Sequence, residues 1–174
     1  MKPAAVICQV PKQSAIASYL PGAYFHYSWT IAAADSSCSA LGQFLKTVSA
    51  TPGWVNALMS LRNTVVAVVG LKNLGGLGQF DPSKPEAEYR SGDRVGIFTL
   101  IENSPTEVLL GDKDKHLDVT LSVHTAPGSV AGSTMVTVTT VVHIHNLLGR
   151  LYMLPVTPLH KAIVPSVLSA IAGR

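Results

Sequence analysis

Alternation of apolar and polar positions is clearest over residues 115–125 and 133–145. In each segment, side chains rich in Val and Leu fall on one face, and side chains rich in His, Asp and Thr fall on the other. A period of two residues is that of a β-strand with one buried face. Pro127 and Gly128 lie in the connection between the segments, so the pattern predicts an antiparallel hairpin.

Further strands are predicted where aromatic and β-branched residues cluster, over 24–31, 94–102, 107–111 and a short segment near 86–90. Residues 1–22 lack such a pattern and end on the turn signal Pro21-Gly22, so we expect an irregular segment there. Glycines and prolines between residues 74 and 92 predict a loop.

Apolar residues spaced three and four apart predict helices after the first strand and at the end of the chain. The first runs from an N-cap at Asp35 or Ser36 to about Val48, and the second from Pro52 to about Val69. The third runs from about Leu147 to Ala172, with Asn146 as its N-cap. Prolines at 155, 158 and 165 each remove a backbone donor, which leaves either one kinked helix or a short helix followed by a longer one.

The predicted order is one strand, two short helices, four or more antiparallel strands and a long C-terminal helix. This order predicts an α+β fold in which a curved antiparallel sheet lies against the last helix. A length of 174 residues fits a single domain, 1–174, with a core large enough to need no disulfides.

The composition indicates extensive apolar surface. Hydrophobic residues make up 47% of the chain, charged residues only 13%, and the mean hydropathy is +0.32. Such surface belongs to a core, an interface or the wall of a cavity. The formal net charge of +3 is spread along the chain without a run of Lys or Arg, which argues against a nucleic-acid-binding function.

The N-terminus and the cysteines favour a cytoplasmic protein. The first apolar run ends at Pro11 and Lys12, too early for a signal peptide, and no run reaches the ~18 apolar residues of a membrane span. Cys8 and Cys38 lie in apolar stretches, and two cysteines do not make a disulfide framework. We therefore expect reduced thiols and no membrane span.

Three blocks of sequence carry a family resemblance. They are Trp54 with Leu61-Arg62-Asn63 and Gly70-Leu71-Lys72, then 111–118 (GDKDKHLD), then 145–152 (HNLLGRLY) with Pro158-Leu159-His160. Together these blocks resemble an uncharacterised bacterial family of START-like domains, the superfamily of the major birch-pollen allergen and many polyketide cyclases. Members are sometimes fused behind a short-chain-dehydrogenase-like NAD-binding domain.

The resemblance implies a helix-grip fold, in which the sheet wraps around a long, kinked C-terminal helix and often leaves an apolar cavity. It implies no activity and no cofactor. We expect any oxidoreductase-type partner to be a separate chain.

The apolar faces supply the predicted lining of such a cavity. These positions are Leu117, Val119, Leu121, Val138, Val142, Met153, Ile163 and Val167, with Arg150 and Tyr152 as polar contacts at the mouth. The same pattern also fits a filled core. Asn146 and His160 belong to the same polar group, for which fold closure is the alternative to ligand contact.

Histidines and aspartates form a second cluster on the polar side of the hairpin. If the hairpin brings His116 near His143, then Asp114, Asp118 and His145 join them on one face. The simplest interpretation is a polar outer face of the sheet. A dimer interface, acid–base chemistry and a metal site formed by His116, Asp118, His143 and His145 are the alternatives, but the spacing matches no metal-binding signature.

The sequence thus predicts a domain that binds a small apolar or aromatic ligand. An enzyme, or an enzyme accessory acting with an oxidoreductase-type partner, is the first alternative. A homodimeric interaction module using apolar surface between Leu61 and Leu74 is the second.

Overall fold

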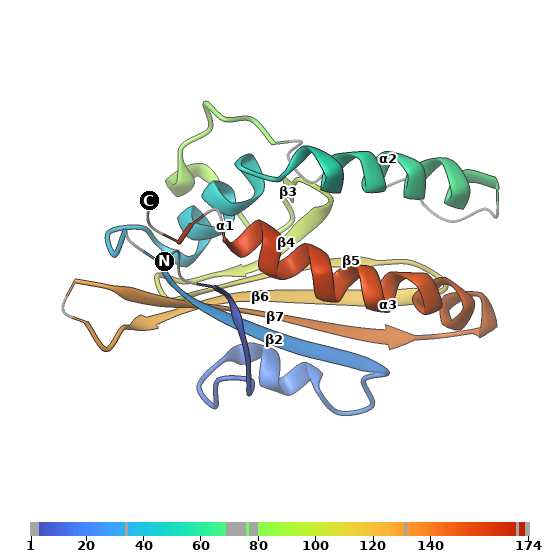
Figure 1. The fold of residues 1–174 in the computed structure, drawn as a ribbon, viewed down its shortest axis with the longest axis horizontal. Coiled ribbons are helices and arrows are strands. Elements are labelled where there is room, and N and C mark those ends of the chain that lie inside the picture. The colour runs from blue at the N-terminus through green and yellow to red at the C-terminus, as the bar shows by residue number, and fades with distance from the viewer. Residues whose placement is uncertain are drawn as a thin grey trace.

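The computed structural model describes residues 4–33, 35–68, 76, 80–130, 132–169 and 171–172. Within these residues the chain forms a seven-stranded antiparallel sheet and three α-helices, which confirms the α+β class (Figure 1). Three segments discussed above lie wholly or partly outside the described residues. They are Gly70-Leu71-Lys72, the end of the apolar segment 61–74 and most of the glycine-rich stretch 75–78.

The sheet has the strand order β1-β2-β7-β6-β5-β4-β3, and every neighbouring pair is antiparallel. The strands are β1 (Val6–Cys8), β2 (Phe25–Ala33), β3 (Arg94–Val95), β4 (Phe98–Asn103), β5 (Glu107–Lys113), β6 (Leu117–Pro127) and β7 (Thr134–Ile144). The predicted hairpin is β6–β7, in which Val119 lies opposite Val142. The long strand β2 pairs with β7, so the first and last long strands are neighbours.

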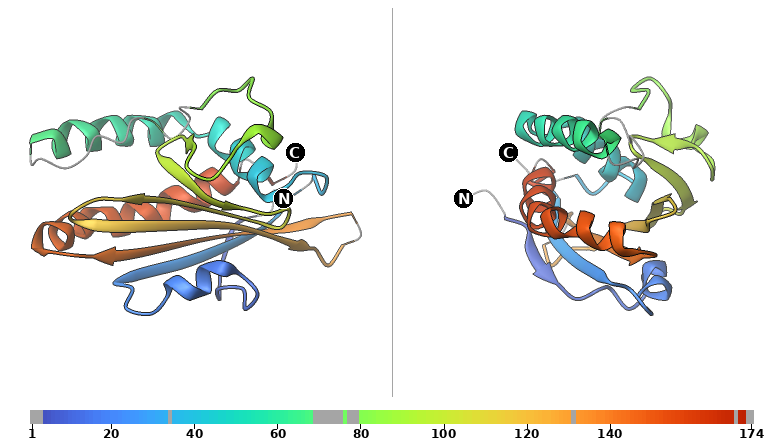
Figure 2. Two further views of the ribbon diagram at one scale, coloured as in Figure 1. Left: turned by 180° about the vertical axis from the view of Figure 1, so that it is seen from behind. Right: turned by 90° about the vertical axis from the view of Figure 1, so that its right-hand side faces the viewer.

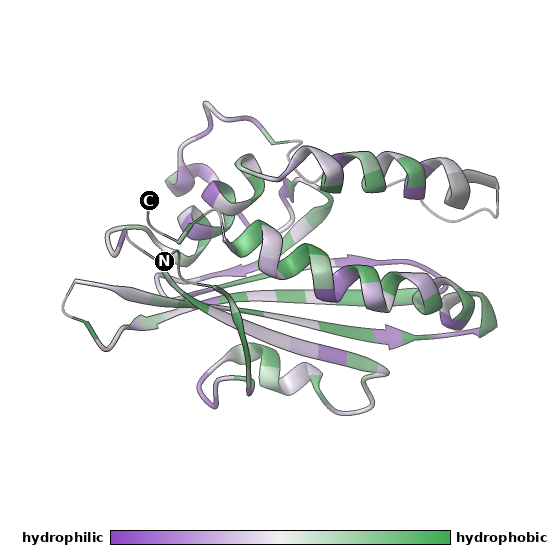
Figure 3. Ribbon diagram, viewed as in Figure 1, coloured by the Kyte–Doolittle hydropathy of each residue, from purple (hydrophilic) through white to green (hydrophobic). Residues whose placement is uncertain are grey.

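Helices cover one face of the curved sheet. They are α1 (Ala40–Ser49), α2 (Gly53–Val68) and α3 (Leu147–Leu168), and α3 runs along the strands (Figures 1 and 2). Figure 3 shows hydrophobic positions along α3 and along the strands beneath it. The largest buried cluster lies in this layer and includes Phe44, Leu121, Val136 and Leu168.

The opposite face is also partly covered, which corrects the expectation of an irregular segment over 1–22. The strand β1 extends the sheet edge, and the 3₁₀ helix η1 (Ala15–Tyr19) lies against the outer face. Ile16 of η1 packs with Leu109 and Val141 there. A strand of three residues is too short for a period to be read, and its pairing partner β2 supplies the hydrogen bonds.

Between residues 86 and 102, one strand prediction was wrong and the other missed a turn. The segment near 86–90 forms the 3₁₀ helix η2 (Glu86–Glu88), and the predicted strand over 94–102 is the hairpin β3–β4. Its turn contains Gly96 at φ +63°, between the paired residues Val95 and Phe98. A positive φ at the first residue of a two-residue turn favours glycine.

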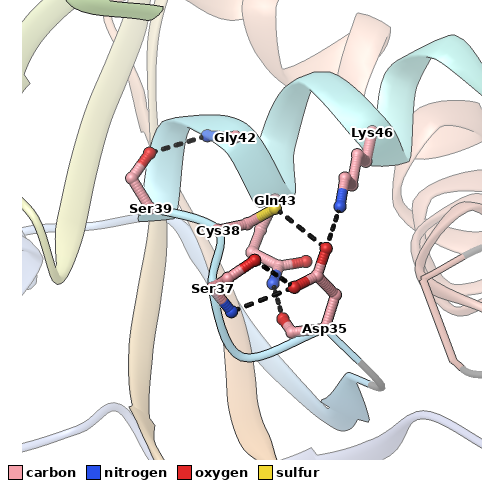
Figure 4. Close-up of polar contacts among 7 residues, drawn as sticks. All are labelled: Asp35, Ser37, Cys38, Ser39, Gly42, Gln43 and Lys46. Atoms are coloured by element: carbon pink, nitrogen blue, oxygen red, sulfur yellow. Dashed lines mark hydrogen bonds and ion pairs between the residues drawn. The ribbon is translucent and has the colours of Figure 1, made fainter.

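The N-cap of α1 is Ser39, not Asp35 or Ser36. Ser39 Oγ accepts a hydrogen bond from the Gly42 N–H at 3.0 Å (Figure 4). Asp35 instead accepts from the Ser37 N–H at 3.0 Å and pairs with Lys46, whose ammonium lowers the pKa of the Asp35 carboxyl. A carboxylate held by its own turn and by a lysine is no longer directed at the helix end.

The C-terminal segment forms one continuous helix, which decides between the two predicted alternatives. Its N-cap is Asn146, as predicted, and Asn146 Oδ1 accepts from the Gly149 N–H at 3.2 Å. Pro155 and Pro158 lie on the exposed side of the helix. There the carbonyls that the prolines leave unpaired can bond to water, so the helix continues through them.

Candidate functional site

A cavity of about 260 Å³ lies between the sheet and the helices. Its wall is mostly aliphatic and comes from β6, β7, α1, α2 and α3. The wall contains all the predicted aliphatic and sulfur-containing residues together with Tyr152: Leu117, Val119, Leu121, Val138, Val142, Tyr152, Met153, Ile163 and Val167.

Arg150 lies away from this cavity. Its side chain is exposed, and its guanidinium carbon is 6.0 Å from the centre of the Tyr24 ring. Residues four apart in an α-helix lie on the same side, because one turn takes 3.6 residues. Arg150 therefore shares the exposed side of α3 with Leu154, which is 66% exposed, whereas Tyr152 and Met153 line the cavity.

Three polar residues of the wall were not predicted as cavity residues. Arg62 comes from α2, Asp112 from β5 and Asp114 from the β5–β6 turn, whereas His160 of α3 belongs to the group for which ligand contact was one alternative. Arg62, Asp112 and His160 belong to the three blocks that carry the family resemblance. Residues 62 and 112 are far apart in the chain, so no local pattern could have shown that they meet.

Arg62 and Tyr152 connect α2 to α3 at the cavity wall. Arg62 Nε donates to the Tyr152 hydroxyl at 3.0 Å, and the guanidinium carbon is 5.5 Å from the centre of the Tyr152 ring. Arg62 Nη1 also donates to Asn63 Oδ1 at 2.9 Å. This geometry combines a charge-assisted hydrogen bond with a cation–π contact.

Two carboxylates lie in the same part of the wall. Asp112 Oδ1 is 3.6 Å from Arg94 Nη1, and the Asp112 side chain is 10% exposed. Asp114 Oδ1 accepts from the backbone N–H groups of His116 at 2.6 Å and Leu117 at 3.0 Å. Each carboxylate is therefore positioned by protein donors.

His160 supplies a neutral imidazole to the wall. Its Nε2 is 3.0 Å from Thr140 Oγ1, and its ring meets Phe25 edge-on with ring centres 5.4 Å apart. Burial lowers the pKa of His160 to about 4, so the ring is uncharged near neutral pH. Its Nδ1 is buried and has no hydrogen-bond partner among the described residues.

The predicted histidine cluster is only partly brought together. The register places Asp118, not His116, opposite His143, and Asp118 Oδ1 is 3.1 Å from His145 Nε2. His143 Nε2 lies 3.1 Å from the Pro21 carbonyl, and His116 Nδ1 lies 3.1 Å from Asn146 Oδ1. Among the described residues, no group of three or more His, Cys, Asp and Glu side chains is arranged to hold a metal ion.

The second and third blocks meet where α3 begins. Asn146 Nδ2 donates to the Lys115 carbonyl at 3.0 Å, and a Cβ on Gly149 would lie 2.4 Å from the His116 carbonyl oxygen. Only glycine allows this close approach of helix and turn. Asn146 and Gly149 therefore hold α3 on the β5–β6 turn, which is the fold-closure role considered for Asn146.

The sequence profile of a family described as "Protein of unknown function (DUF2867)" matches residues 19–167. The chain belongs to this family. The match confirms that the chain belongs to an uncharacterised family, and it covers every predicted lining residue and all of the observed cavity wall except Leu168. No curated protein and no solved structure is significantly similar to the chain.

None of the described helices combines the length and the apolar character needed to cross a lipid bilayer.

Proposed function

We propose that the protein binds a small apolar or aromatic molecule in the cavity between the sheet and α3. The observation that carries this proposal is an apolar cavity of about 260 Å³. Small-molecule sites are concave and mostly apolar, with a few polar groups that orient the ligand. The mostly aliphatic wall with Arg62, Asp112 and His160 matches this description.

The size and polarity of the cavity define the ligand. Small-molecule sites commonly measure roughly 300–1,000 Å³, so this cavity of about 260 Å³ suits a molecule of two or three rings or a short chain. Leu121, Val138 and Val167 present hydrocarbon, while the charged residues Arg62 and Asp112 come from α2 and β5. An apolar body with one polar end matches this distribution.

We also propose that the fold is the helix-grip fold of START-like domains. The order of strand, two helices, strands and long final helix supports this assignment. The pairing of β2 with β7, and α3 lying along the sheet with a cavity between them, support it further.

Titration with the neutral fluorophore N-phenyl-1-naphthylamine tests the ligand proposal. We expect saturable binding to the wild-type protein. Val138→Phe fills part of the cavity and should weaken binding at least tenfold, whereas the matched Val130→Phe, at a position 68% exposed, should leave it unchanged. Overpacking costs about 1–3 kcal/mol, so thermal unfolding must show that both variants are folded.

Native mass spectrometry of the purified protein adds a test without a chosen probe. A reproducible extra mass, lost in Val138→Phe, would identify a bound species. Unsaturable fluorescence in the wild type, together with an unmodified mass, would reject the proposal.

A further inference from the structure

The Tyr152 hydroxyl has unused donor capacity. A phenol has one proton to donate and lone pairs that accept. One lone pair accepts from Arg62 Nε at 3.0 Å, and no acceptor for the hydroxyl proton exists among the described residues. Tyr152 is half-buried and lies in the cavity wall, so the proton is available to a molecule in the cavity.

Arg62 makes this hydroxyl a stronger donor. The guanidinium stays charged at all physiological pH values, and its hydrogen bond draws electron density from the phenol oxygen. Hydrogen bonds in such a chain polarise one another, the more so in a site of low dielectric constant. Arg62 and Tyr152 thus form a hydrogen-bond chain that ends at the cavity.

The wall of the cavity favours a neutral acceptor. Asp112 and Asp114 already place two carboxylates in the wall, and Asp112 lies 3.6 Å from Arg94. An ionised ligand would lose its hydration against the mostly aliphatic remainder of the wall, which costs free energy. A ketone, aldehyde, ester or amide oxygen accepts the same hydrogen bond without that penalty.

Apolar residues pack against the Tyr152 side chain. Tyr152 packs against a buried cluster that includes Leu117, Val142 and Met153, and all three line the cavity. A carbonyl oxygen bonded to Tyr152 therefore leaves its hydrocarbon substituent against this cluster. We infer that the ligand is a neutral carbonyl compound with an apolar body, held by the Tyr152 hydroxyl at the Arg62 side of the cavity.

This inference rests on the proposed function, and two probes of nearly equal shape separate it from that function. 2-Acetylnaphthalene carries the carbonyl, and 2-ethylnaphthalene replaces it with a methylene group. Each is titrated against the full chain by displacement of N-phenyl-1-naphthylamine. We expect Tyr152→Phe to weaken binding of the ketone about tenfold and to leave the hydrocarbon unchanged.

Tyr27→Phe is the matched control, because Tyr27 packs against the same buried cluster as Tyr152 but does not line the cavity. It should leave both affinities unchanged. A second readout needs no variant: the carbonyl stretch of the bound ketone should lie at lower frequency than in hexane, as a hydrogen-bonded carbonyl does.

The outcomes are distinguishable. Unchanged ketone affinity in Tyr152→Phe, or an unshifted carbonyl stretch, overturns the inference and leaves cavity binding intact. Tighter binding of 2-naphthoate than of the ketone overturns the choice of a neutral ligand. Failure of every probe to bind removes both the inference and the proposed function.

Discussion

The Ser14 hydroxyl donates to Oε1 of Glu107 at 2.5 Å on the face of the sheet opposite the cavity. Ser122 donates to the same oxygen at 2.6 Å, and the Ala15 N–H donates to Oε2 at 2.8 Å. Burial by itself raises the pKa of Glu107, but these three hydrogen bonds outweigh it, and the pKa lies below its usual value. The ionised carboxylate therefore fastens the N-terminal segment to the sheet.

Glu107→Gln should lower the free energy of unfolding by about 1.5–3 kcal/mol, the range of a hydrogen bond to a charged group. The amide has one accepting oxygen and brings two N–H donors toward donors that already point at the site. Denaturant unfolding measures the loss, and hydrogen exchange of the Ala15 amide localises it. The exposed Glu102→Gln is the control, and equal stability of the two variants would show that the carboxylate is not needed.

His160 should make the fold sensitive to mild acid. Burial lowers its pKa from the usual 6.5 to about 4, so between these values the unfolded chain binds a proton that the folded chain does not. Stability therefore rises with pH across this window and is lost as the pH falls from 6.5 toward 4. The loss should reach roughly 3 kcal/mol, at about 1.4 kcal/mol for each pKa unit.

His160→Gln removes this titration and keeps a polar group near Thr140. Its free energy of unfolding, measured by denaturant titration across the same window, should change much less than that of the wild type. The control is the same substitution at an exposed position of β2, His26→Gln. Parallel pH profiles for the His160 variant and the wild type would contradict the assignment.

Gly149→Ala should destabilise the fold by about 1–3 kcal/mol, although alanine favours helices. The new Cβ would lie 2.4 Å from the His116 carbonyl oxygen and 3.0 Å from Ile144 Cγ2. Gly53 begins α2 and has no atom within 4 Å of a built Cβ, so Gly53→Ala should gain up to about 1 kcal/mol. Thermal unfolding measures the melting temperatures of the two variants. A shift of both melting temperatures in the same direction from the wild type would contradict the packing argument.

Pro158→Ala should stabilise α3 by roughly 2 kcal/mol, because it restores a backbone donor inside the helix. Part of that gain is offset by the larger conformational freedom of the unfolded chain. Pro82 lies at an exposed turn outside the helices, so Pro82→Ala changes only the freedom of the unfolded chain and should lower stability slightly. Denaturant unfolding of both variants tests this, and a loss of stability in Pro158→Ala would show that the proline is favourable in the folded helix.

Elements with a long, regular pattern were predicted from the sequence, and short ones were not. The strands β6 and β7, with eleven residues each, were predicted close to their observed bounds because alternation over that length excludes a helix. The strand β1 and the hairpin β3–β4 have two to six residues per strand, so their pairing partners decide their structure. The predicted start of α1 was misplaced because aspartate and serine are both good N-caps. In the structure Ser39 caps the helix, while the Asp35 carboxylate is held by Lys46.

The sequence by itself determined the α+β class, the alternating faces of β6 and β7, and the Asn146 cap of α3, because each depends on neighbours within a few residues. It also indicated which aliphatic faces turn toward the covering helix, but it left open whether they fill a core or line a cavity. Only the tertiary structure shows that Arg62 contacts Tyr152 and that Arg150 lies away from the cavity. It alone also shows that His143 and His145 have different partners. Such contacts depend on helix orientation and strand register, which are set by packing among distant segments and leave no mark in any local pattern.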